Sequence, residues 1–173
     1  MTAVAHVEEG WSMSMFDTEA WKGKYREAAQ EKLPGEQVEA AWLFYRTGGY
    51  AGLALGPLSP LAAVVARTIG KKRAGGLPNQ FVLALTPTKV HALKCRPHGS
   101  KAKVGEELAV WDRSGLQVGV RDAAVNTEVT LESPAEGEKI VCSTGKDATS
   151  REFLELLAQP SAPAAGPAAP ATA

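Results

Sequence analysis

The stretch from Gln80 to Leu157 limits most strongly what this chain can fold into, because apolar and polar residues alternate through it in short runs. The clearest run extends from Val125 to Leu131, where Val, Thr and Leu occupy every second position and polar residues lie between them. A two-residue period places successive side chains on opposite faces of a strand, so this run is typical of a strand with one buried face. Several such strands separated by turns predict an antiparallel barrel or sandwich.

Seven strands are predicted in all. Their approximate ranges are 38–45, 81–85, 90–95, 107–111, 116–121, 125–132 and 139–143. The Thr86-Pro87-Thr88-Lys89 sequence predicts a tight turn between two of them, because proline fixes φ where a turn needs it. The segment from Arg96 to Gly105 is predicted to be a loop.

One helix is predicted before the first strand and another after the last strand. Apolar residues recur at spacings of three and four over residues 18–32, after Asp17 or Thr18 as a cap, and Leu33-Pro34-Gly35 ends the pattern. A last helix follows Thr149, which has capping-box spacing to Glu152 and precedes an apolar stripe. The fold class is therefore mainly β with helices (α+β): a seven-stranded antiparallel barrel or sandwich capped by a C-terminal helix, with an N-terminal helix and a helical insertion.

Composition shifts predict the domain boundaries. Residues 1–16 are expected to be a flexible tail, 17–35 the N-terminal helix, 36–158 the main domain, and 159–173 a disordered Ala/Pro tail. The 46–79 insertion holds an apolar helix at about 60–70, begun by Pro60, since proline suits a first helical turn. This helix is either buried or in contact with a membrane or partner, and its predicted interface residues are Leu61, Val64, Val65 and Ile69.

The 173-residue chain is long enough for one domain with a core, and its two cysteines are too few for a disulfide framework. No basic stretch followed by an apolar run opens the sequence, so no secretory signal is predicted. We expect a cytoplasmic protein in a reducing compartment. The high content of Ala, Gly and Pro suits a high-GC bacterial source.

Seven strands followed by one helix is the element order of the pleckstrin-homology (PH) superfold. The run from Phe81 to Leu93 resembles the opening hairpin of bacterial PH-like domains, and Trp111-Asp112-Arg113 and the strand from Val125 to Leu131 are compatible with it. The resemblance covers about residues 36–158. It implies a non-catalytic scaffold that binds lipids, peptides or proteins. The 46–79 insertion is long for the first connection, and the final helix lacks the tryptophan of eukaryotic PH domains.

Charge is unevenly spread although the formal net charge is zero. The segment from Arg67 to Lys103 holds nine Lys or Arg residues and no Asp or Glu. In a PH-like barrel the loops after the first and third strands lie at the same open end, so two basic loops, 67–73 and 96–103, are predicted to converge there. The predicted anion- or lipid-binding residues are Lys71, Lys72, Arg73, Arg96, Lys101 and Lys103. Such a site would attract an anionic lipid surface.

Sequence patterns for catalysis are missing. His91 and Cys95 have ligand-like spacing, but only the distant Cys142 is available to complete a zinc set. The sequence has neither a P-loop nor a Gly-x-Ser-x-Gly elbow. We therefore expect no enzyme activity, no cofactor and no metal site. Nucleic acid is not expected as a partner, because no aromatic-rich basic face accompanies the charges.

Two functions remain open from the sequence. The first is a PH-like binding module on an anionic membrane surface or polyanion. The alternative is a protein–protein adaptor or homo-oligomer subunit, in which the apolar insertion packs on a partner chain and the charge asymmetry orients assembly.

Overall fold

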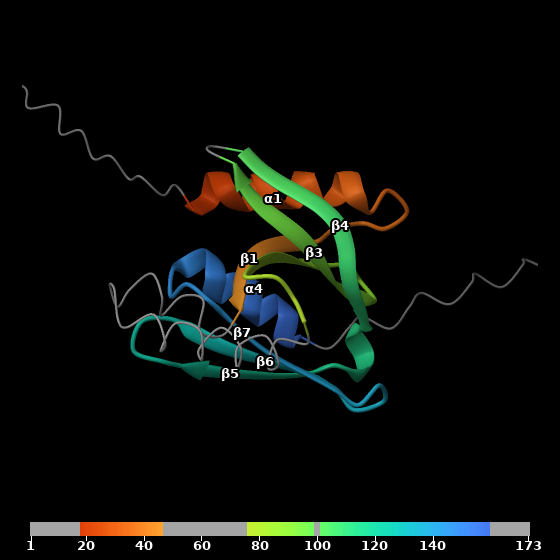
Figure 1. Cartoon of the computed structure of the whole chain (residues 1–173), viewed down its shortest axis with the longest axis vertical. Coiled ribbons are helices and arrows are strands. Elements are labelled where there is room, and N and C mark those ends of the chain that lie inside the picture. Colours follow the sequence, from red (N-terminus) through yellow and green to blue (C-terminus); the bar gives the residue numbers. More distant parts are fainter. Residues whose placement is uncertain (1–17, 47–75, 99–100, 160–173) are drawn as a thin grey trace, which may run out of the picture.

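The computed structural model describes residues 18–46, 76–98 and 101–159 (Figure 1). The elements in chain order are α1 (Thr18–Lys32), β1 (Ala40–Arg46), β2 (Gln80–Leu85), β3 (Lys89–His98), β4 (Lys101–Asp112), η1 (Arg113–Gly115), β5 (Gln117–Asp122), β6 (Thr127–Ser133), β7 (Glu138–Thr144) and α4 (Ala148–Ala158). The predicted tail at 1–16, the predicted helix at 60–70, and all of the predicted 159–173 tail except Gln159 lie outside the described residues.

The strands form one seven-stranded antiparallel sheet in the order β4-β3-β2-β1-β7-β6-β5. Strand β1 lies in the middle and pairs with both β2 and β7. The two edge strands, β4 and β5, are consecutive in the chain and are joined through η1. The Trp111 indole at the end of β4 donates a 2.9 Å hydrogen bond to Glu138 at the start of β7, so strands from the two halves of the sheet meet at this corner. The predicted α+β class with seven antiparallel strands is confirmed.

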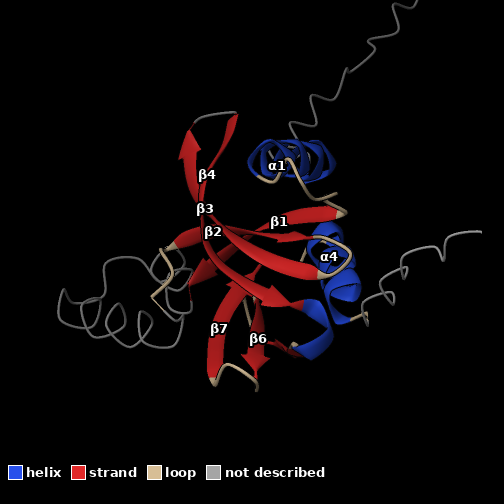
Figure 2. Ribbon diagram, turned by 90° about the vertical axis from the view of Figure 1, so that its right-hand side faces the viewer, coloured by secondary structure: helices blue, strands red, loops and turns tan. Residues whose placement is uncertain are grey.

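Both helices lie on the same side of the strands (Figure 2). Helix α1 packs mainly on β4 and β1, where the Tyr25 ring meets the Trp42 ring edge-on at 5.8 Å. Helix α4 packs on β1 through Phe153, whose ring centroid lies 5.5 Å from that of Phe44. The apolar face predicted for residues 18–32 and the stripe predicted for the last helix both point into this core, as helical periodicity requires.

Strand register brings the ends of β1 and β3 to the same end of the sheet. The amide of Arg46 donates to the carbonyl of Asn79, and Phe81 pairs with Lys94. Arg46 at the end of β1 and Asn79 just before β2 therefore lie at the same end of the sheet as Lys94 in β3. This common end of the sheet is the one expected for the ends of the first and third strands, whereas residues 47–75 of the connection lie outside the described ranges.

Three local predictions were wrong. Residues 96–98 and 101–103 are not a loop but the far end of a long β3–β4 hairpin. The last helix is capped by Asp147 rather than Thr149, since the Asp147 side chain accepts the Ser150 amide at the N-terminus of α4. Val125 lies outside β6, which begins at Thr127, and its side chain is 62% exposed.

Candidate functional site

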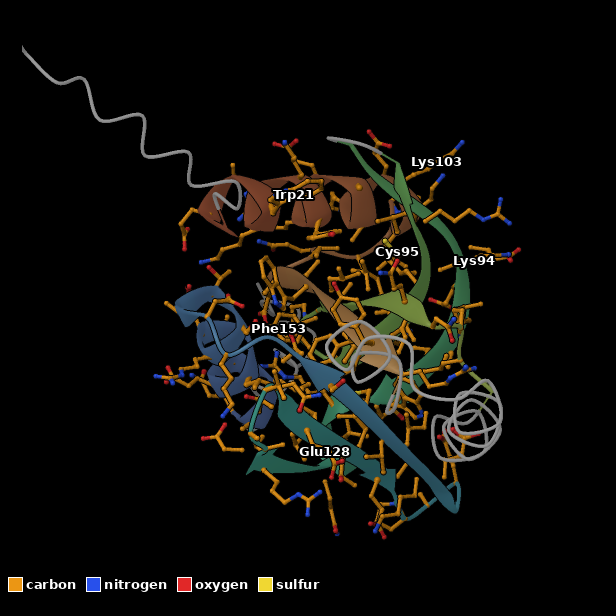
Figure 3. The ribbon with its side chains drawn as sticks, turned by 60° about the vertical axis from the view of Figure 1, so that its left-hand side comes forward. Trp21, Lys94, Cys95, Lys103, Glu128 and Phe153 are labelled. Carbon is orange, nitrogen blue, oxygen red and sulfur yellow. The ribbon has the colours of Figure 1, made fainter. Side chains whose placement is uncertain are left out.

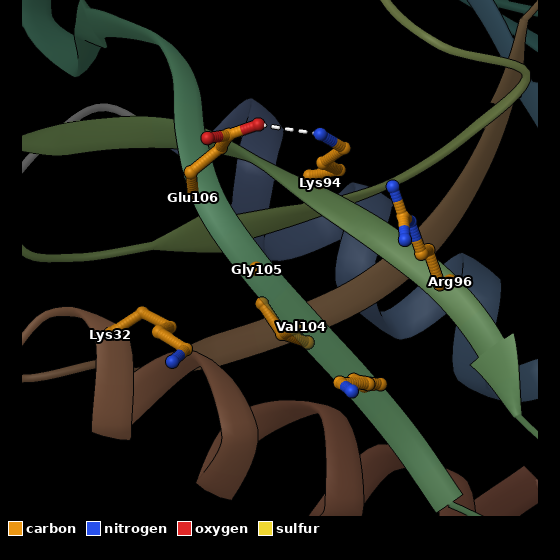
Figure 4. A pocket seen from close by; sticks show the side chains of 7 residues that line it. Lys32, Lys94, Arg96, Val104, Gly105 and Glu106 are labelled. Carbon is orange, nitrogen blue, oxygen red and sulfur yellow. Dashed lines mark hydrogen bonds and ion pairs between the residues drawn. The ribbon is translucent and has the colours of Figure 1, made fainter.

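A hollow of about 300 Å³ lies between the end of α1 and the β3–β4 hairpin (Figure 4). It is called the basic hollow below. The residues that line it are Lys32, Lys94, Arg96, Lys103, Val104, Gly105 and Glu106. Its volume is at the lower end of the range for small-molecule sites, so it suits a compact group rather than an extended ligand. Lys94 and Lys103 point outwards from the hairpin, away from Phe153 in the core (Figure 3).

Two β-bulges in the hairpin set the positions of these side chains. Ala92 pairs with Ala109, Leu93 with Glu107 and Cys95 with Val104, so β4 carries one extra residue at each of the two steps. The bulges bring Lys103 opposite Arg96; a regular ladder continued from Ala92 would place Gly105 there. Bulges re-aim side chains in this way and are frequent near functional sites.

The Arg96–Lys103 pair is unfavourable for the hairpin itself, because like charges directly opposite each other on neighbouring strands repel. Gly105 leaves the floor of the hollow open; a Cβ there would meet Lys94 atoms at 3.6 Å, which is ordinary contact. Two like charges on opposite strands and a glycine within a strand both weaken a sheet locally. Such locally unfavourable choices are more common at functional positions.

One carboxylate lies in the basic hollow. Glu106 accepts a hydrogen bond from Lys94 with an Nζ–Oε1 distance of 2.6 Å (Figure 4). This hydrogen bond, then the charge of Lys94 and more weakly that of Arg96, hold the pKa of Glu106 below its ordinary value. Glu106 is therefore ionised at neutral pH. Within the described ranges, no carboxylate pairs with the three other cations, Lys32, Arg96 and Lys103.

The structure joins only part of the predicted anion site. Arg96 and Lys103 both line the basic hollow, and the backbone of Lys101 pairs with His98 at the tip of the same hairpin. The other predicted site residues lie outside the described residues: Lys71, Lys72 and Arg73 of the basic loop, and Leu61, Val64, Val65 and Ile69 of the interface. The convergence of the two basic segments therefore stays a prediction.

Lys32 and Lys94 also line the hollow but were missing from the predicted set. Lys94 could have been found, because it precedes Arg96 by two residues and strand periodicity puts both on one face. Lys32 carries only a weak signal, as a basic residue in the last turn of α1. Its approach to the hairpin depends on how α1 packs on β4, which no local pattern specifies.

A second polar cluster lies around His91, which is buried at 2% exposure. Its Nδ1 is 2.6 Å from Glu107 and its Nε2 is 3.1 Å from Glu36. Glu36 also accepts hydrogen bonds from Thr86 at 2.9 Å and Lys89 at 3.2 Å. Partial burial raises the pKa of Glu36, but these hydrogen bonds and the His91 charge outweigh it and lower that pKa. The cluster ties the connection after α1 to β2, β3 and β4.

His91 and the two cysteines are held in buried surroundings. The His91 ring is enclosed between two carboxylates, and burial raises the pKa of the Cys95 thiol to about 11. Burial also raises the pKa of Cys142, so neither thiol supplies much thiolate at neutral pH. The residues described here contain no cluster of three or more His, Cys, Asp or Glu side chains suited to a metal.

No helix within the described ranges is long and apolar enough to cross a membrane. No protein-family model matches the chain, and no curated protein matches it.

Proposed function

We propose that this chain is a non-catalytic PH-like binding module that associates with an anionic membrane surface through the basic hollow. The observation that carries the proposal is the group of three exposed cations, Lys32, Arg96 and Lys103, that have no carboxylate partner within the described ranges. Unpaired cations around a concave surface favour a phosphorylated headgroup, and an arginine can bind it through two parallel hydrogen bonds.

The arrangement of the elements supports the PH-like part of the proposal. Seven antiparallel strands are followed by one helix that packs on the sheet, and β1 and β3 end on the same side. This is the order that the resemblance implies. Because one fold serves many ligands, the choice of an anionic surface depends on the basic hollow and not on the fold.

A lipid surface is favoured over a soluble protein ligand because Arg96 and Lys103 are exposed and lie in the outer part of the β3–β4 hairpin, near its tip. Each basic residue near an anionic bilayer contributes about 1 kcal/mol. The three unpaired cations would therefore contribute about 3 kcal/mol, which is enough for weak, salt-sensitive association.

The test is sedimentation with phosphatidylcholine vesicles that contain either no anionic lipid or about 20% phosphatidic acid, whose headgroup is a phosphate monoester, at low and physiological salt. We expect binding to the anionic vesicles only. Replacing both Arg96 and Lys103 by Glu should weaken binding at least about 30-fold, since about 2 kcal/mol of attraction is lost. A matched control reverses Lys146 and Arg151, both exposed and away from the hollow.

Competition with soluble glycerol 3-phosphate separates a lipid surface from a free phosphate group as the source of the anion. Equal binding of the hollow variant and the control variant would refute the basic hollow as the contact. Absence of salt-sensitive binding by the unmodified protein would refute the membrane proposal.

A homo-oligomer subunit is the second candidate, and one observation favours it. Among the described residues, both edge strands of the sheet carry exposed apolar side chains: Leu108 and Val110 on β4, and Val120 on β5. An open edge is a template for pairing with a second copy. Light scattering after size exclusion would report a stable dimer in this case, and Val120→Lys should reduce it to a monomer. A monomeric unmodified protein would eliminate this candidate.

A further inference from the structure

Glu106 occupies an unusual place for a site that is to receive an anion, because its carboxylate lies among the four cations of the basic hollow. Its position follows from the second β-bulge, which falls between the Leu93–Glu107 and Cys95–Val104 pairs. The next residue, Glu107, turns instead to His91 at 2.6 Å. The two adjacent glutamates thus contact different partners. Of the two, only Glu106 contributes negative charge to the hollow.

We propose that Glu106 is an internal competitor of the ligand: it holds Lys94 while the hollow is empty and releases Lys94 to a dianionic oxyanion when one binds. This inference rests on the proposed function, and it deepens it by naming a ligand charge class and a specificity-determining residue. The competing ligands are phosphate monoesters and sulfate, whose three or more terminal oxygens can contact several cations at once.

The exchange requires that the Lys94–Glu106 pair be easy to break. Both side chains are at least one-third exposed, and exposed ion pairs contribute little to stability. A dianion that contacts Arg96 and Lys103 offers Lys94 two negative charges in place of one. The pair is thus weak enough to be displaced by a doubly charged anion, whereas a singly charged anion offers Lys94 no more negative charge than Glu106 already does.

Proton linkage follows from the same geometry. Lys94 lowers the pKa of Glu106 in the empty hollow, so a ligand that takes Lys94 away and adds negative charge must raise that pKa. By reciprocity, protonation of Glu106 must strengthen ligand binding by the same factor. Sulfate is a suitable probe, because its own charge does not change over the range in which Glu106 titrates.

The experiment is a titration of the full chain with sodium sulfate. Binding is monitored through the amide NMR shifts of residues 94–96 and 103–106. We expect Glu106→Gln to raise sulfate affinity about fivefold at neutral pH. Glu155→Gln removes the same charge from an exposed position on α4 and should change affinity less than about twofold. In the unmodified protein, saturating sulfate should raise the pKa of Glu106 measured from its side-chain carboxyl shift.

The outcomes separate this inference from the proposed function. If sulfate binds the unmodified protein and Arg96→Glu with Lys103→Glu abolishes that binding, but Glu106→Gln behaves like Glu155→Gln, the competitor role is wrong and the basic hollow stands. An unchanged Glu106 pKa under saturating sulfate also overturns the competitor role. If neither sulfate nor anionic vesicles bind at low salt, the proposed function and the competitor role both fail.

Discussion

Glu36→Gln should destabilise the protein by about 2 kcal/mol near neutral pH. The Glu36 carboxylate accepts hydrogen bonds from Thr86 and Lys89 and lies 3.1 Å from the buried His91 ring. Lys89 is 42% exposed, so its pair with Glu36 contributes less than about 1 kcal/mol. Most of the loss should therefore come from Thr86 and His91, which lose a charged acceptor, because the amide of the substituted side chain offers one neutral oxygen in place of two that share a negative charge.

The loss should depend on pH with a defined sign. The pKa of Glu36 is lower in the folded protein than in the unfolded chain, so its contribution is fully present above the unfolded value, about 4.3. The contribution disappears as the pH falls through the lowered folded pKa. The difference between the unmodified protein and Glu36→Gln should therefore have its full size near pH 6 and shrink below about pH 4.

Urea unfolding at several pH values, followed by tryptophan fluorescence, measures this difference. Glu31→Gln is the matched control, because Glu31 is exposed on α1 and has no ion-pair partner within the described ranges. A loss of about 2 kcal/mol corresponds to a melting temperature lower by about 4–8 °C. The cluster would lose its assigned role if Glu36→Gln cost less than about 0.5 kcal/mol near pH 6, or if the full cost persisted at the lowest pH.

Three further substitutions test other contacts. Phe153→Ala should lower the free energy of unfolding, measured by chemical denaturation, by about 3–5 kcal/mol, because it leaves a cavity where α4 packs on Phe44. A decrease of less than about 1 kcal/mol would refute that packing. Asp147→Ala should cost about 1 kcal/mol by thermal melting, since Asp147 caps α4 at Ser150, and Asp147→Asn should retain most of the stability. Arg113→Lys should lower the free energy of unfolding by about 2 kcal/mol, because one ammonium group cannot replace the guanidinium hydrogen bonds to Glu39, the Thr86 carbonyl and the Leu156 carbonyl. An unchanged midpoint of urea unfolding would contradict this prediction.

Local pattern was sufficient for the elements of the fold. The apolar spacing over residues 18–32 predicted α1 with its observed bounds, and a two-residue period located every strand to within a few residues, apart from the extended β4. These features could be predicted because neighbouring residues determine which face of a helix or strand can be buried. Arg96 and Lys103 could also be proposed as site residues, since charge segregation is visible along the chain.

Tertiary structure alone decided how the candidate site is assembled. Two bulges set Lys103 opposite Arg96, and helix packing brought Lys32 to the hairpin from a distant segment of the chain. The same long-range packing placed Glu36 against His91 and left Glu106 among the cations of the basic hollow. Cross-strand register and helix docking depend on the packing of the whole sheet, so they leave no local periodicity from which these contacts could be predicted.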